Sequence, residues 1–111
     1  MFSIKVNNEE YEKIINKIKV YEYAIDKDMD IFVGDYILFQ KRPDFFDAVL
    51  TKVIDKKKFV DFEEMAKYMS FKELGFEGFT KSEVIDFCNK KFDADLVKQH
   101  GVVVFKYEIS K

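Results

Sequence analysis

Few residues of this chain combine a reactive side chain with a spacing that supports catalysis. His100 is the only histidine, and no serine or cysteine stands at a recognisable triad spacing from it, so a nucleophile–histidine–acid arrangement is not predicted. Cys88 falls on the apolar stripe of an expected helix, and no histidine, cysteine or carboxylate cluster has metal-ligand spacing. The sequence also lacks a glycine-rich phosphate loop. We therefore expect neither a metal nor a cofactor.

The charge of the chain argues against broad binding to DNA or RNA. The formal net charge is −2, whereas proteins that depend on phosphate neutralisation carry a basic excess. The short basic runs at 41–42, 56–58 and 90–91 are more typical of solvated loops or helix faces. Recognition of a single nucleotide or one RNA end is compatible with this charge. Aromatic side chains could stack on a base, although phenylalanines at helical and alternating positions are more typical of a core.

Length and composition favour one globular domain spanning residues 1–111. The chain is 48% apolar and 17% aromatic, which is enough buried surface to offset the entropy of ordering. A single cysteine cannot form an internal disulfide, and this indicates a reducing compartment. No apolar run approaches the roughly 20 residues that span a bilayer. We expect a cytoplasmic protein without a membrane partner.

Hydrophobic periodicity predicts the elements that must position any site. Strands are expected at 2–6, 19–25, 36–39, 46–54 and 102–109. Helices are expected at 9–17, where Asn7 and Glu10 have capping-box spacing, at 62–69 after Asp61, and from the capping box 80–83 onward. A short helix or turn should follow and end before Gly101. Residues 26–30 and 41–44 should form loops, and 71–79 should be irregular. Strands at both termini could pair and close a barrel, although the pattern also permits an open α+β sheet.

Three stretches carry a family resemblance through their order and spacing. They are the helix-to-strand segment 14–24, the segment 31–39 with its Gly34-Asp35 pair, and the closing segment 100–105 after His100-Gly101. Segments 59–62 and 72–76 fit between them. Together these stretches resemble the ASCH (activating signal cointegrator homology) family over nearly the whole chain. The resemblance implies an α+β fold: a small PUA-like β-barrel of about five to six strands with two to three helices packed on it.

The resemblance also implies a set of site residues. Bacterial members of the family include amidohydrolases that release acetate from N4-acetylcytidine through a lysine, a threonine and a distant glutamate. By motif these positions fall on Lys19, Glu22 and Glu77 of this chain. The chain departs from the pattern where Glu22 replaces the threonine and Ala24 replaces an arginine. Glu22 cannot act as a hydroxyl nucleophile, but a carboxylate can orient or deprotonate a water molecule.

Strand geometry sets a condition on this site. Alternate residues of a strand face opposite sides, so Lys19 and Glu22 converge only if Lys19 precedes the regular strand or a bulge intervenes. The turn before Lys19 carries Lys17 where the family has a glycine, which makes a positive φ less favourable there.

The leading expectation is an ASCH domain that binds a nucleoside, nucleotide or RNA end in a cleft beside the barrel. The implied ligand-binding residues are Lys19, Tyr21, Glu22 and Glu77. One alternative is an amidohydrolase acting on an acylated nucleoside such as N4-acetylcytidine, with Lys19, Glu22 and Glu77 as its catalytic residues. A second alternative is a protein-interaction domain with a degenerate pocket and a protein partner.

Overall fold

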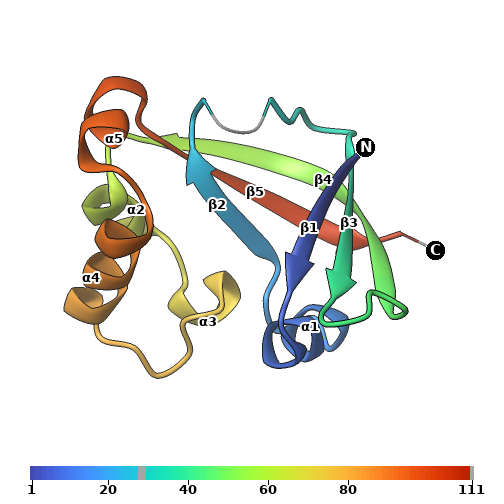
Figure 1. Ribbon diagram of the computed structural model, residues 1–111. Helices are drawn as coiled ribbons and strands as arrows, with labels where there is room; N and C mark the ends of the chain where they lie inside the picture. The colour runs from blue at the N-terminus through green and yellow to red at the C-terminus, as the bar shows by residue number, and fades with distance from the viewer. Residues whose placement is uncertain (28–29, 111) are drawn as a thin grey trace.

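A computed structural model describes residues 1–27 and 30–110 of the chain. In these ranges the fold is α+β, with one five-stranded sheet curled into half a barrel and five helices beside it (Figure 1). The predicted α+β class with a small barrel-like sheet of about five strands is therefore confirmed, but five helices are present in these ranges in place of the two to three expected. Residues 28–29, in the middle of the expected charged loop 26–30, lie outside the described residues.

The bounds of the elements follow the expected pattern closely at both ends of the chain. The strands are β1 (Phe2–Val6), β2 (Tyr21–Ile25), β3 (Tyr36–Lys41), β4 (Ala48–Phe59) and β5 (Val102–Ile109). The helices are α1 (Asn8–Ile15), α2 (Phe62–Tyr68), α3 (Phe71–Leu74), α4 (Lys81–Lys91) and α5 (Ala94–His100).

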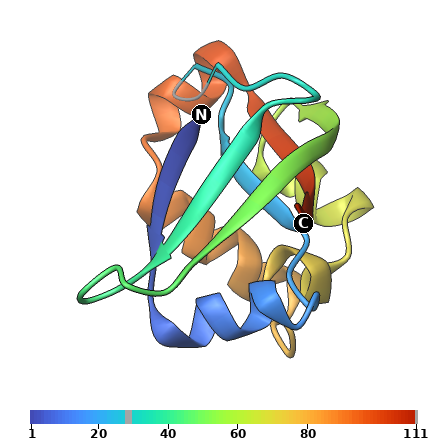
Figure 2. The ribbon, with the colours of Figure 1, turned by 90° about the vertical axis from the view of Figure 1, so that its right-hand side faces the viewer.

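The sheet has the strand order β1-β3-β4-β5-β2, with β1 and β3 parallel and the other neighbours antiparallel. The expectation that the terminal strands pair with each other is wrong, because β3 and β4 lie between β1 and β5. The edge strands are β1 and β2 instead, and α1 connects them across one end of the curled sheet (Figure 2). Lys19, which lies between the end of α1 and the start of β2, is therefore close to this helix.

Strand β4 is longer than predicted and starts later. The expected strand 46–54 begins at Ala48, with Phe46 88% exposed before it, and it continues to Phe59. The run 56–58 is consequently part of a strand, not the loop or helix face that its charge suggested. It pairs with residues 103–105 of β5 after a bulge between Val53 and Asp55. Long-range pairing thus overrides the local preference of three consecutive lysines.

Helix starts agree with the predicted caps. The side chains of Asn7, Asp61 and Thr80 accept hydrogen bonds from backbone N–H groups three residues on, at the first turns of α1, α2 and α4. The Thr80 cap is a complete capping box with Glu83, and these hydrogen bonds hold the pKa of the Glu83 carboxyl below its usual value. One short helix, α3, forms within the stretch 71–79 that was expected to be irregular.

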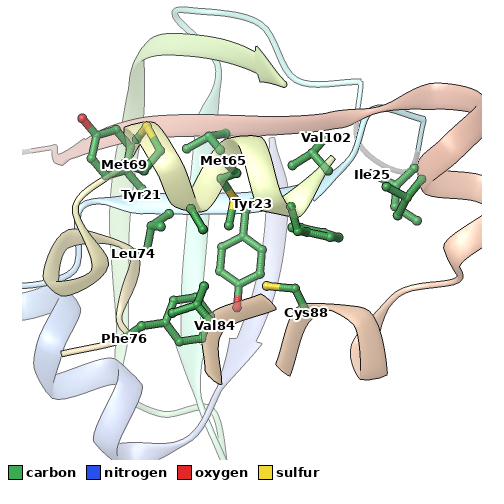
Figure 3. Packing of buried hydrophobic residues seen from close by; sticks show 14 residues of the cluster. Tyr21, Tyr23, Ile25, Met65, Met69, Leu74, Phe76, Val84, Cys88 and Val102 are labelled. Atoms are coloured by element: carbon green, nitrogen blue, oxygen red, sulfur yellow. The ribbon is translucent and has the colours of Figure 1, made fainter. Parts of the chain in front are cut away.

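The core has two parts, one on each face of the sheet. Inside the curl, α1 packs on the strands through residues such as Ile14, Phe39 and Phe105. On the outer face, the helices that follow β4 pack on β2 and β5 through a second cluster that includes Tyr23, Phe62 and Cys88. Figure 3 shows this second cluster, with Tyr23 directed from β2 towards Val84 and Cys88 of α4. Strand β2 contributes to both parts because its five residues are all buried.

Candidate functional site

The backbone of Lys19 is held in place between α1 and β2. Its N–H donates to the Lys13 carbonyl at 3.0 Å, and its own carbonyl accepts from the Tyr107 hydroxyl at 3.2 Å. The turn before it has Lys17 at φ 60°, so a lysine takes the left-handed conformation that the sequence made unfavourable. Since β2 begins at Tyr21, Lys19 precedes the regular strand. This is one of the two conditions under which Lys19 can meet Glu22.

Lys19 forms a buried ion-pair cluster with two carboxylates. Its Nζ lies 3.3 Å from Oε2 of Glu22 and also donates to Oε1 of Glu10. Lys19 is 4% exposed and Glu22 is 7% exposed. The second oxygen of Glu22 accepts from the backbone N–H of Tyr23 at 3.3 Å. The structure thus brings Lys19 and Glu22 together and adds Glu10 as a third member.

The charge state of Lys19 decides which chemistry it can support. Burial lowers the pKa of Lys19, but the charges and hydrogen bonds of Glu22 and Glu10 outweigh it and raise the pKa above the ordinary value. Lys19 is therefore an ammonium ion at neutral pH. It can donate hydrogen bonds to a carbonyl or an anion, but it cannot act as a base without first losing a proton that both carboxylates stabilise.

A cavity of about 260 Å³ opens beside this cluster. Its polar wall comes from α1, the cap before it, the lysine between α1 and β2, and the end of α4: Asn7, Glu9, Glu10, Lys13, Lys19 and Lys91. Its other wall is mainly aromatic and comes from β2, the loop around α3, and α4: Tyr23, Leu74, Gly75, Phe76, Phe79 and Phe87.

The aromatic wall is a packed group centred on Phe76. The Phe76 ring centroid lies 5.5 Å from that of Tyr23 and 5.3 Å from those of Phe79 and Phe87. Phe79 is 40% exposed and Phe87 is 45% exposed. These two rings therefore present apolar faces to the cavity. Helical spacing had suggested that Phe87 belongs to the core, and this expectation is wrong. Burial raises the pKa of Tyr23, so its hydroxyl is neutral.

Gly75 makes room for the Lys19 side chain. It ends α3 with φ +95°, and a Cβ atom added there would lie 3.1 Å from Cδ of Lys19. The backbone N–H of Val20 also donates to the carbonyl of Glu73 in α3 at 2.9 Å. The α3 segment is thus attached to the start of β2 and forms the wall along which the lysine extends.

The other residues expected at the site do not line this cavity. Glu22 lies behind Lys19, and Tyr21 packs in the outer core with Lys106 Nζ 5.9 Å from its ring centroid. Glu77 is exposed in the loop between α3 and α4, where its neighbours Phe76 and Phe79 line the cavity instead. Of the expected set, Lys19 is thus the residue in direct contact with the cavity.

Glu10 was missed because its spacing to Asn7 indicated a capping box. The backbone N–H of Glu10 does donate to Asn7 Oδ1 at 2.8 Å, but its carboxylate contacts Lys19. The aromatic wall was missed because Phe87 has the helical spacing typical of a core residue and Phe79 lies in the stretch that was expected to be irregular. The one signal for this wall in the sequence was Phe87, an apolar residue at a position of α4 that is exposed.

Lys19 also lines a second cavity, which has a volume of about 370 Å³. Residues of the α1–β2 turn, β4 and β5 line it, among them Ile14, Val20, Ile54 and Lys106. It has no exposed aromatic wall and no carboxylate paired with Lys19. The first cavity therefore has the more specific combination of groups.

The ranges 1–27 and 30–110 contain no group of three or more histidine, cysteine or carboxylate residues that could hold a metal ion. Within the same ranges, no helix has the length and apolar character needed to cross a membrane.

Two solved structures have the same fold over almost the entire chain. The crystal structure of hypothetical protein PH0355 is 21% identical, with a TM-score of 0.81 and coverage of 98% of both chains. The solution NMR structure of protein PF0455 from Pyrococcus furiosus is 18% identical, with a TM-score of 0.71 and coverage of 99% of this chain and 97% of that one. No protein-family model matches the sequence, and no curated protein matches it. The comparisons establish a shared small α+β domain.

Proposed function

We propose that the chain is an ASCH-type, PUA-like domain that binds the base of a nucleoside, nucleotide or RNA end in the cavity beside Lys19. The observation that carries the proposal is the pairing of an exposed aromatic wall with the Lys19–Glu10 ion pair around one small cavity. The order of the sequence motifs supports the family assignment independently.

The two walls match the two chemical surfaces of a base. Stacking on an aromatic side chain contributes about 1–3 kcal/mol per base, and Phe79 and Phe87 present exposed rings for it. At the edge of a base, exocyclic amino groups donate and ring carbonyls accept hydrogen bonds. The Glu10 carboxylate is an acceptor and the Lys19 ammonium is a donor. An acceptor beside a donor matches a base that offers an amino group next to a ring acceptor.

The size of the cavity favours a small ligand. A volume of about 260 Å³ is slightly below the range of about 300–1,000 Å³ that is usual for ligand-binding pockets. One base fits this scale better than a folded nucleic acid does. The net charge of −2 is consistent with a ligand that is recognised through its base more than through many phosphates.

Titration of isotope-labelled protein followed by amide NMR tests the proposal. Cytidine, guanosine, N4-acetylcytidine and a short single-stranded RNA would be added in turn at moderate salt. We expect saturable shifts at Lys19, Glu10, Phe79 and Phe87. Phe79→Ala should weaken binding by about tenfold, since one stacking contact is lost. Phe46→Ala is the matched control, because Phe46 is also an exposed phenylalanine but does not line the cavity.

The same titration separates the alternatives. Appearance of cytidine and acetate from N4-acetylcytidine would establish the amidohydrolase. Glu10, the cavity-wall carboxylate that contacts Lys19, would then be the first residue to test as the group that activates water. An unchanged spectrum with all four ligands would sink the nucleoside proposal and favour the protein-interaction domain.

A further inference from the structure

Lys91 is the cation of the cavity wall that has no carboxylate partner among the described residues. Lys19 is held by Glu10 and Glu22, and Lys13 Nζ lies 3.5 Å from Glu9. Lys91 Nζ instead lies 5.4 Å from the ring centroids of both Tyr23 and Phe92. Lys19 thus keeps one of its three N–H donors for a ligand, whereas no carboxylate among the described residues engages those of Lys91.

The position of Lys91 places its charge beside the proposed base-binding wall. Phe87 and Lys91 are four residues apart on α4, so their side chains lie on the same face of the helix. Both line the cavity. Lys19 Nζ lies 6.0 Å from the Tyr23 ring centroid, so the two ammonium groups approach the same ring. A ligand in contact with Phe87 is thus within reach of both.

The charges of the wall direct an anionic group towards Lys91. Glu9 and Glu10 lie on the α1 side of the cavity, where a phosphate would be repelled. The α4 side carries Lys91 and the neutral Tyr23 hydroxyl, which is directed towards α4. Tyr23 is 6% exposed, and its hydroxyl is a further donor on this side.

We propose that the ligand carries a phosphate and that Lys91 binds this phosphate; this inference rests on the proposed function. The preferred ligand is then a nucleotide or a phosphorylated RNA end, not a nucleoside. A phosphate monoester has about −1.5 to −2 charge at pH 7 and three acceptor oxygens. An ammonium ion binds such a group as a point charge. The base then lies between the aromatic wall and the Lys19–Glu10 pair, and the phosphate lies at the end of α4.

The test compares dissociation constants of cytidine and guanosine with those of their 5′- and 3′-monophosphates. Calorimetry or NMR titration would be carried out at low and at moderate salt. We expect at least one monophosphate to bind about tenfold tighter than its nucleoside at low salt, as one charge-assisted hydrogen bond predicts. The advantage should shrink as salt is added. Comparison of the two isomers shows which hydroxyl of the ribose carries the phosphate.

Lys91→Gln should reduce the ratio of monophosphate affinity to nucleoside affinity from about tenfold to about one. Lys90→Gln is the matched control, because Lys90 is an exposed neighbour on the same helix and does not line the cavity. Thermal unfolding of both variants would reveal any loss of helix stability, which would lower all affinities equally.

Three results would overturn the inference. Equal affinity for nucleosides and their monophosphates would overturn the inference but leave the base-binding function intact. A phosphate advantage that persists in Lys91→Gln would assign the phosphate to another residue. Failure of every nucleoside and nucleotide to bind would reject the inference together with the proposed function.

Discussion

The ammonium group of Lys19 lies 3.3 Å from Oε2 of Glu22, although the two residues belong to different local structures. Lys19 ends the connection after α1, and Glu22 is the second residue of β2. Their side chains meet because the chain turns into the strand between them. Both are nearly inaccessible to solvent, so the pair lies between the cavity and the core of the domain.

Loss of one partner of this pair should destabilise the domain strongly. Lys19→Met leaves the Glu22 carboxylate buried and unpaired, and such changes cost about 3–5 kcal/mol. Adding Glu22→Gln should restore much of the lost stability, since the amide keeps an acceptor for the Tyr23 N–H. Urea unfolding at pH 7 measures both variants. A double variant less stable than Lys19→Met would contradict the buried pair.

Gly75→Ala should affect both stability and the site. The φ of +95° disfavours alanine by about 1–2 kcal/mol, and the new Cβ would also displace the Lys19 side chain. Gly78→Ala is the matched control, because Gly78 has φ +85° but nothing within 4 Å of an added Cβ. We expect chemical denaturation to show losses in both variants, and NMR titration to show weaker ligand binding in Gly75→Ala alone. Equal binding by the two would mean that the Lys19 side chain adjusts without consequence.

Lys17→Gly should be neutral or stabilising by up to about 1 kcal/mol, because glycine adopts a φ of 60° without the steric cost that lysine bears. The same change at Glu12, an exposed position within α1, should instead destabilise by about 1 kcal/mol. Thermal unfolding of the two variants compares the signs directly. Destabilisation by Lys17→Gly comparable with that by Glu12→Gly would show that the turn does not hold the conformation described.

The buried thiol of Cys88 should make stability fall in alkaline solution. Burial raises the pKa of Cys88 from 9.0 to about 12, against the opposing effect of Lys91. The unfolded chain therefore releases this proton first, so the contribution is complete below pH 9 and is lost as pH rises towards 12. In that window the free energy of unfolding should decrease by up to about 1.4 kcal/mol per pH unit.

Cys88→Ala isolates this contribution. The variant should be less stable at pH 7 because a buried side chain is shortened. It should nevertheless lose less stability than the original protein between pH 9 and pH 10.5. Identical pH dependence in urea unfolding curves of the two proteins would assign the alkaline loss to tyrosines, among which burial raises the pKa of Tyr107 and Tyr23.

Elements with a strong local signal could be predicted from the sequence. Strands β1 and β5 have the expected bounds, and the caps at Asp61 and Thr80 start α2 and α4. Alternation and capping act over a few residues, so a single sequence contains them. The course of β4 through 56–58 could not be predicted in this way. Its lysines are held in a strand by pairing with β5, about 45 residues further along the chain.

The site residues also divide into those that local sequence could predict and those that depend on tertiary packing. Sequence motifs placed Lys19 and Glu22 near each other, because only three positions separate them at the junction of a helix and a strand. Glu10 is nine residues from Lys19, and its local spacing pointed to a helix cap. Glu77 was placed by motif order, yet it is exposed beside the cavity wall. Which of several carboxylates faces a lysine depends on how helices pack, which local pattern does not encode.

The sequence by itself determined the formal net charge of −2, the type of most helices and strands, and most of the positions where they begin and end. Only the tertiary structure decided the strand order, the burial of Lys19 between two carboxylates, and the gathering of Phe76, Phe79 and Phe87 into one cavity wall. The physical reason is distance along the chain. Hydrogen bonds of caps and the alternation of strands are local, whereas the α3–α4 segment meets α1 and β2 only after the whole sheet has curled and packed.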